Sequence, residues 1–236
     1  TGSLIDIILK EDFSVLDAHP TYVLSRAPTR VTFSGGGSDL TYYFADRTGA
    51  VLNAAINRYC NVALRKRSDK QIHVTSFDLD KEFNLDDFED LELIPFDFRL
   101  IKAILKFVKP NFGFDLQVSS DFSVGSGLGG SSTLVVAVLE AFSKLRGDYW
   151  TKREIAEFAF KVERLDLGVS GGWQDQYAAA YGGVNFIQFT LKRAFLSIVT
   201  LLIVCFIVFS LMELVPGTCA ERYLAFKNTQ GSQITF

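Results

Sequence analysis

A glycine- and serine-rich segment is the part of the chain best suited to bind phosphate: Gly125, Ser126, Gly127, Leu128, Gly129, Gly130, Ser131 and Ser132. Glycine has no Cβ, so backbone N–H groups in such a loop are free to converge. The start of a helix adds unpaired N–H groups and the positive end of a dipole. The segment therefore predicts an anion cradle for phosphate. A turn that only packs a helix against a sheet is the alternative.

The residues on either side of this loop predict the elements that position it. Apolar residues alternate with polar ones over residues 112–119, which is the period of a strand, and they recur with helical spacing from Leu134 to Phe142. The loop lacks the lysine of the P-loop motif, and its spacing is not that of the dinucleotide-binding fingerprint. Neither of those two nucleotide sites is therefore our first interpretation.

Phosphoryl transfer also needs a divalent cation, and the sequence offers oxygen ligands for one. The hydroxyl of Ser131 or Ser132 is one candidate ligand for Mg²⁺. Glu163 is another, because Mg²⁺ prefers carboxylates and this residue lies near the end of a predicted helix. That helix begins at a capping box formed by Thr151 and Glu154 and extends to about Leu165.

Three charged residues are candidates for the remaining chemistry. Asp175 follows the turn Gly171-Gly172 and could accept the proton of a sugar hydroxyl, or it could only complement a helix dipole. Arg30 could neutralise the transferred charge, or it could be an exposed strand residue. Asp39 could bind sugar hydroxyls, or, with Ser38, cap a short helix over residues 40–47.

Hydrophobic periodicity predicts the rest of the secondary structure. We expect strands over residues 21–34, 50–66, 71–77 and 184–189, and a helix capped by Asp97 and ended by Pro110. The apolar face of that helix consists of Phe98, Ile101, Ile104, Leu105 and Val108. A further short helix is expected over residues 177–181, and the acidic residues 78–92 are expected at the surface.

Composition excludes several functional classes. The 236 residues are 48% hydrophobic and carry a net charge of −3 without an arginine-rich run, so nucleic acid is not an expected partner. The two histidines and three cysteines have no metal-ligand spacing, which argues against a zinc site. Three scattered cysteines fit a reducing compartment, so we expect a cytoplasmic protein. Residues 1–20 contain charged residues and do not resemble a secretory signal.

The chain changes character near residue 190, and we expect one domain over residues 1–190 and an atypical segment over residues 191–236. Ala194–Met212 contains 19 residues without a charge, which makes it a candidate membrane span. Its many β-branched residues favour a buried strand pair or a core helix instead. We favour the buried alternative and keep the membrane span open.

Three motifs in order resemble those of the GHMP small-molecule kinases. The stretch from Arg26 to Asp39 resembles their first motif, Gly125–Ser132 their ATP-phosphate motif, and Gly171–Ile187 the segment that carries their acidic catalytic residue. The Gly35-Gly36-Gly37-Ser38-Asp39 variant looks most like that of the D-glycero-D-manno-heptose 7-phosphate kinases. The resemblance covers about residues 21–190 and implies an α+β fold similar to domain 2 of ribosomal protein S5.

The resemblance also implies a role for each motif residue. Asp175 matches the base, Arg30 the basic residue beside the transferred phosphoryl, and Ser131 and Glu163 the ligands of Mg²⁺. Asp39, with Gly36 and Gly37, matches the part that contacts the sugar. The implied activity is transfer of the γ-phosphoryl of ATP to the anomeric hydroxyl of a heptose 7-phosphate. ATP, Mg²⁺ and a sugar phosphate are the implied ligands, and no particular oligomeric state is implied.

The chain departs from the family pattern at two places. Ser123 stands where the ATP-phosphate motif has proline, which loosens the approach to the loop without abolishing it. Residues 191–236 do not resemble the ferredoxin-like second domain of the family, so we expect that domain to be largely missing or replaced. Two alternatives to an active kinase follow: a nucleotide-binding remnant without activity, and a derivative anchored in a membrane.

Overall fold

The computed structural model describes residues 21–190, 194–214 and Phe226. The chain divides into two units, Thr1–Thr190 and Leu191–Phe236, and the division falls where the composition changes. The expectation that residues 1–20 are not a secretory signal concerns a segment outside the described residues.

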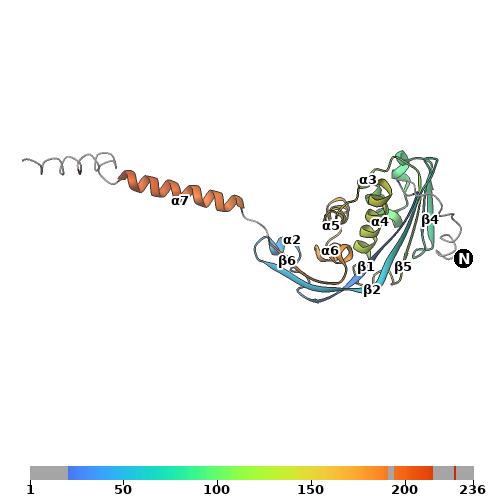
Figure 1. Ribbon diagram of the computed structural model, residues 1–236, viewed down its shortest axis with the longest axis horizontal. Helices are drawn as coiled ribbons and strands as arrows, with labels where there is room; N and C mark the ends of the chain where they lie inside the picture. The colour runs from blue at the N-terminus through green and yellow to red at the C-terminus, as the bar shows by residue number, and fades with distance from the viewer. Residues whose placement is uncertain (1–20, 191–193, 215–225, 227–236) are drawn as a thin grey trace, which may run out of the picture. The chain divides into compact units, whose positions relative to one another are not determined.

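The described part of the first unit is built on a six-stranded sheet with the order β1-β2-β5-β3-β4, in which β6 also pairs with β2 (Figure 1). Among the described strands, β3 and β5 are the one parallel pair, and the other neighbours are antiparallel. The first half of β2 pairs with β6 and its second half with β5, so this strand spans the whole unit. The strands are β1 (Tyr22–Ser34), β2 (Gly49–Lys66), β3 (Ile72–Ser76), β4 (Lys81–Leu85), β5 (Phe114–Ser120) and β6 (Val184–Phe189).

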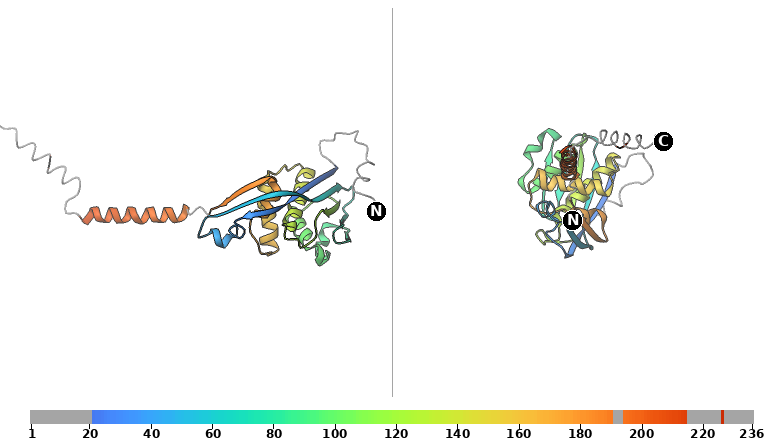
Figure 2. Two further views of the ribbon diagram at one scale, coloured as in Figure 1. Left: turned by 90° about the horizontal axis from the view of Figure 1, so that it is seen from below. Right: turned by 90° about the vertical axis from the view of Figure 1, so that its left-hand side faces the viewer.

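Four helices cover one face of this sheet (Figures 1 and 2). They are α3 (Arg99–Val108), α4 (Gly130–Arg146), α5 (Lys152–Phe160) and α6 (Gln174–Tyr181), and a short helix α2 (Thr41–Phe44) follows β1. The core lies between the helices and the sheet, where Phe142 of α4 packs edge-on against Phe114 of β5 with ring centroids 5.2 Å apart. Both rings are fully buried, so α4 is fixed on the sheet by its apolar face.

The structure confirms the predicted start of α5 and its continuation to about Leu165. Thr151 accepts a hydrogen bond from the backbone of Glu154, and the Glu154 side chain accepts one from the backbone of Thr151. The helix continues as a π-helical turn, Lys161–Asp166, which carries Glu163. A π-helical turn is rare and is frequent at functional sites.

One local prediction was wrong, and another was incomplete. Asp97 does not cap α3, because it lies in a 3₁₀ turn, Phe96–Phe98, and pairs with Lys81 of β4. The five residues predicted for the apolar face of α3 are nevertheless buried. The acidic residues of the stretch 78–92 are exposed or half-buried, as expected, but the stretch also contains β4 and the start of a 3₁₀ turn, Phe88–Leu93, and it buries Phe83, Leu85 and Leu91. Those three apolar residues were the signal for buried structure within an acidic segment.

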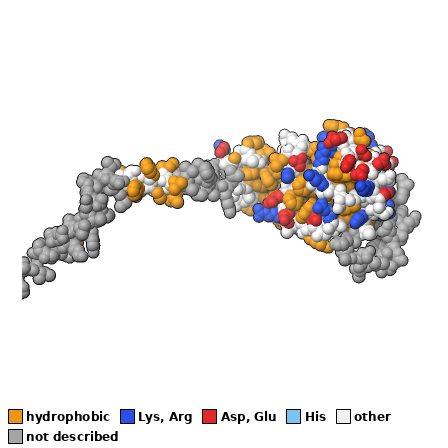
Figure 3. Space-filling model, turned by 90° about the horizontal axis from the view of Figure 1, so that it is seen from above, with side chains coloured by type: hydrophobic (Ala, Val, Ile, Leu, Met, Phe, Trp, Pro, Cys, Tyr) orange, Lys and Arg blue, Asp and Glu red, His pale blue; other side chains and the backbone are white. Residues whose placement is uncertain are grey.

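The described part of the second unit is mainly one helix, α7 (Ala194–Leu214). The expectation of a buried strand pair was therefore wrong. Side chains are described for residues 201–211, and the apolar ones among them are exposed, from 50% for Ile207 to 72% for Phe206 (Figure 3). Counting described residues alone, no helix is both long and apolar enough to cross a membrane.

Candidate active site

The glycine- and serine-rich segment forms a loop that leads into α4. Gly125, Gly127 and Gly129 have φ angles of +80°, +74° and +79°, a conformation that residues with a Cβ rarely adopt. Gly129 is the N-cap of α4, and no side chain caps the helix there. The N–H groups of the first turn are therefore not satisfied by a capping side chain, and the positive end of the α4 dipole faces this loop. The geometry suits an anion such as phosphate.

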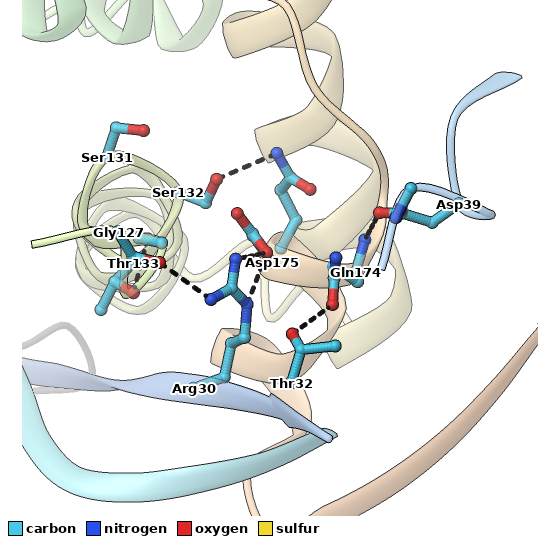
Figure 4. Close-up of polar contacts among 12 residues, drawn as sticks. Arg30, Thr32, Asp39, Gly127, Ser131, Ser132, Thr133, Gln174 and Asp175 are labelled. Atoms are coloured by element: carbon cyan, nitrogen blue, oxygen red, sulfur yellow. Dashed lines mark hydrogen bonds and ion pairs between the residues drawn. The ribbon is translucent and has the colours of Figure 1, made fainter. Parts of the chain in front are cut away.

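Arg30 joins the loop to the acidic residue of α6 (Figure 4). Its guanidinium contacts Oδ1 of Asp175 through Nε at 2.8 Å and through Nη2 at 2.6 Å, and its Nη1 donates to the carbonyl of Gly127 at 3.1 Å. The backbone N–H of Arg30 donates to the carbonyl of Leu128. This bond forms beside an irregularity in the pairing of β1 with β2, between Pro28 and Arg30. Strand irregularities of this kind re-aim side chains next to functional sites.

Asp175 lies where both proton acceptance and charge pairing are possible. Its side chain is 17% exposed. Burial raises the pKa of this carboxyl above its usual value, and the charge and hydrogen bonds of Arg30 oppose that rise. Arg164 also lowers the pKa, and the nearby Asp39 raises it. An Asp with a raised pKa holds a proton more readily than an exposed one, as a general base must.

The loop and Asp175 are in direct reach of each other. A Cβ at Gly129 would lie 3.2 Å from Cγ of Asp175, which is closer than ordinary van der Waals contact. Glycine at this position therefore lets the phosphate loop approach the carboxylate. The alternative that Asp175 only complements the α6 dipole does not account for its contacts with β1 and the loop.

Asp39 links the first glycine turn to the start of α6. Its buried carboxylate accepts from the backbone N–H of Gly37 through Oδ1, at 3.1 Å, and from that of Gln174 through Oδ2, at 3.0 Å. The expectation that Ser38 and Asp39 cap the helix after them was wrong. Helix α2 begins after Leu40 without a side-chain cap, and Ser38 Oγ instead donates to the carbonyl of Gly35 at 2.7 Å. Gly36 lies in the same turn.

Glu163 forms the centre of a buried polar cluster behind the loop. The Ser131 hydroxyl donates to its Oε1 at 2.5 Å, and the Ser132 hydroxyl donates to its Oε2 at 2.6 Å. Gln176 Nε2 donates to the same Oε2 at 2.7 Å and to Ser132 Oγ at 3.1 Å. Glu163 and Gln176 have no exposed surface, whereas Ser131 is exposed.

The chemistry of this cluster fits a magnesium ion. Ser131 and Glu163 supply a hydroxyl and a carboxylate oxygen, which are hard ligands of the kind that Mg²⁺ binds. Within the described residues, no group of three or more His, Cys, Asp and Glu side chains could hold a metal ion. One carboxylate is nevertheless enough where substrate phosphates and water complete the coordination, as is usual for Mg²⁺.

Three residues of the site were missed by sequence reasoning. Gln176 belongs to the Glu163 cluster, and Gln174 accepts a hydrogen bond from Thr32 of β1 at 2.7 Å through its side chain. Arg164 is nearly buried, and its guanidinium donates to the carbonyls of Val169 and Ser170. The one signal in the sequence was that these residues are neighbours of Glu163 and Asp175. That signal is weak, because a polar residue next to a site residue can equally well be exposed to solvent.

Comparisons with known proteins indicate the family of this chain. Residues 99–183 match the model of the GHMP kinases N terminal domain. The chain is 41% identical over 171 residues to a D-glycero-alpha-D-manno-heptose 7-phosphate kinase of Campylobacter jejuni, covering 71% of this chain and 50% of that protein. It is 34% identical over 173 residues to a galactokinase of Chloroflexus aurantiacus, covering 70% of this chain and 42% of that protein.

A solved structure shares the fold. A D-glycero-D-manno-heptose 1-phosphate kinase from Bacteroides thetaiotaomicron aligns with a TM-score of 0.66 and 34% identity, covering 72% of this chain and 56% of that one. The chain thus spans about half the length of the relatives it matches. The sequence identity, the shared fold and the match over the loop and Asp175 show that this chain belongs to the GHMP kinases, of which it contains the N-terminal domain.

Proposed function

We propose that the chain binds ATP at the Gly125–Ser132 loop and transfers its γ-phosphoryl group to the anomeric hydroxyl of a heptose 7-phosphate. The observation that carries this proposal is the meeting of Arg30, Asp175 and the loop at one place. The similarity to a heptose 7-phosphate kinase supports the choice of acceptor. Sugar kinases of other specificity, such as galactokinase, are also relatives, so the acceptor class is the finer part of the proposal.

The residues of the site account for each part of the transfer. The acceptor hydroxyl oxygen forms a bond to the γ-phosphorus while the bond between that phosphorus and the β,γ-bridging oxygen breaks, and ADP leaves. The hydroxyl proton passes to the carboxylate of Asp175. Arg30 stabilises charge on the moving phosphoryl, and the loop with the first turn of α4 binds the phosphates of ATP. Catalysis then rests on positioning and charge stabilisation.

A bound Mg²⁺ would neutralise phosphate charge in this reaction. Ser131 and Glu163 are the residues that we propose to hold it. Asp39, Gly36 and Gly37 are proposed to shape the sugar side. Both carboxylate oxygens of Asp39 already accept hydrogen bonds from backbone N–H groups. This residue therefore also orders the glycine turn, in addition to any contact that it makes with a sugar hydroxyl.

A coupled assay of ADP release over a panel of sugar phosphates tests the proposal on the full chain. We expect turnover with heptose 7-phosphate that depends on Mg²⁺ and ATP and is lost in Asp175→Ala. The heptose without its phosphate, and galactose, are the matched acceptors that test specificity. A folded wild-type protein that phosphorylates none of the panel would overturn the proposal.

A nucleotide-binding domain without turnover is the second candidate, because the glycine loop and the uncapped start of α4 suit phosphate whether or not an acceptor is bound. Calorimetry with ATP and Mg²⁺ separates the two functions. Binding with no ADP release in the presence of any acceptor supports the second candidate. Binding with turnover supports the kinase.

A further inference from the structure

We infer that Gln176 is a positioning residue for the metal–nucleotide complex, acting by fixing the Glu163 carboxylate. This inference rests on the proposed function, because it concerns how the site of that function holds a cation. Gln176 has no exposed surface, so it touches no substrate itself. Its two amide hydrogens are both used inside the cluster, one on Glu163 Oε2 and one on Ser132 Oγ.

The orientation of the Gln176 amide follows from its partners. A carboxylate only accepts hydrogen bonds, so the NH₂ group must face Glu163, and the opposite orientation would place two oxygens against each other. This leaves Oε1 of Gln176 buried without a hydrogen-bond partner among the described residues. An unsatisfied buried acceptor destabilises a fold. Packing alone therefore does not explain a glutamine here, whereas holding Glu163 does.

The hydrogen bonds divide the Glu163 carboxylate into two sides. Oε2 accepts from Ser132 and Gln176, which are both buried, so this oxygen is held in the interior. Oε1 accepts a hydrogen bond from Ser131, an exposed residue at the start of α4, and lies 3.9 Å from Nη1 of Arg164. The side of the carboxylate next to Ser131 is thus the one that a cation reaches from the phosphate loop. By holding Oε2, Gln176 keeps Oε1 of the same carboxylate in place.

Helix α6 carries both Gln176 and the proposed base, Asp175. Asp175 and Gln176 are consecutive, and side chains one residue apart on a helix point about 100° from each other. Asp175 contacts Arg30, and Gln176 contacts Glu163. One short helix, tied by its backbone at Gln174 to Asp39, therefore sets the relative positions of the proposed base and the proposed cation ligand.

The test measures Mn²⁺ binding to the full chain in the presence of a non-hydrolysable ATP analogue, by electron paramagnetic resonance of free Mn²⁺. Gln176→Met removes both donors while keeping the length of the side chain. We expect the Kd for Mn²⁺ to rise about 10- to 100-fold, as it does when the partner of a metal ligand is removed. Binding of the nucleotide without metal should stay within about twofold of wild type, because the amide contacts the loop at Ser132, whose side chain is buried.

Two further variants separate positioning from stability. Gln176→Asn keeps an amide but is one methylene too short to reach Glu163, so it should weaken Mn²⁺ binding as Gln176→Met does. This variant therefore tests the inference even if Gln176→Met folds poorly. Gln117→Met is the matched control, since Gln117 of β5 is also a glutamine with an unpartnered buried Oε1 but lies outside the site. Saturating Mg²⁺ should restore the kcat of both Gln176 variants, which a loss of fold would prevent.

The outcomes distinguish this inference from the proposed function. Folded Gln176→Met that binds Mn²⁺ with wild-type affinity overturns the inference and leaves the kinase proposal standing. A wild type that binds Mn²⁺ with the analogue, weakened in both Gln176 variants, but phosphorylates no sugar, supports the inference and overturns the kinase proposal. A wild type that binds no Mn²⁺ with the analogue overturns the inference together with the proposed metal ligands.

Discussion

The guanidinium of Arg30 contacts a single oxygen of Asp175, Oδ1, through both Nε and Nη2. The second carboxylate oxygen, Oδ2, lies on the side of Gly129, where a Cβ would be 3.2 Å away. The ion pair thus orients Asp175 so that one oxygen is held by a cation and the other faces the phosphate loop. An acceptor hydroxyl that meets this carboxylate would do so beside the bound phosphates.

Removal of the Arg30 charge should change the pH dependence of the reaction. Arg30 lowers the pKa of Asp175 against the rise that burial causes, so Arg30→Met should raise that pKa further. A base acts only when ionised, and activity falls as pH drops through its pKa. We therefore expect the acidic limb of log kcat/KM to move to higher pH, with kcat reduced about 100-fold. Arg153→Met, at an exposed position of α5, is the control that should leave the limb in place. An unshifted limb in Arg30→Met contradicts the assignment.

The raised pKa of Asp175 also predicts a gain of stability in Asp175→Asn. The folded protein binds a proton at this carboxyl more readily than the unfolded chain does, so the free energy of unfolding falls as pH rises through the folded pKa. The neutral amide avoids that loss. We expect the Tm of Asp175→Asn to exceed that of wild type near neutral pH by a few degrees, while turnover is lost. The difference should shrink as the pH falls toward the pKa of Asp in the unfolded chain, because the wild-type carboxyl is then increasingly protonated in the folded protein as well. A lower Tm for the variant at neutral pH would show that loss of the ion pair with Arg30 costs more stability than removal of the buried charge gains.

The sequence predicted the parts of this site that have local signals. The phosphate loop follows from Gly125, Gly127 and Gly129, because repeated glycines before a helical pattern permit the left-handed conformations that the loop adopts. The start of α5 follows from Thr151 and Glu154, whose spacing forms a capping box. Each of these signals lies within a few residues of the structure it predicts.

The pairings between distant segments had no such signal. Arg30 and Asp175 are 145 positions apart, and neither residue type nor spacing indicates that they pair. Asp39 illustrates the same limit, because a carboxylate before a short helix is a common cap, yet this one bonds to α6 at Gln174. Only the packing of β1, α4 and α6 on each other brings these groups together. Resemblance to a known family was therefore the source of the site hypothesis that linked them.

The capping box at the start of α5 should contribute to stability without taking part in the chemistry. Thr151→Ala removes the side chain that accepts from the backbone of Glu154, at a cost of about 1 kcal/mol in the free energy of unfolding. Urea denaturation followed by circular dichroism measures this loss. Because Glu163 lies in the π-helical turn beyond the far end of α5, we expect the Kd for Mn²⁺ to stay at the wild-type value. An increase in that Kd would show that the capping box also sets the position of Glu163.

Two glycines of the phosphate loop form a matched pair that isolates the contact with Asp175. Gly125 and Gly129 have nearly equal φ angles of +80° and +79°, so an alanine at either position carries a similar backbone strain of about 1–2 kcal/mol. A Cβ at Gly125 meets nothing within 4 Å, whereas one at Gly129 meets the Asp175 carboxylate at 3.2 Å. We expect both variants to lose a similar amount of stability in urea denaturation. The kcat of Gly129→Ala should fall a further 10- to 100-fold below that of Gly125→Ala, since a small displacement of a reacting group has effects of about this size. Equal kcat values for the two variants would mean that the approach of the loop to Asp175 is not required for transfer.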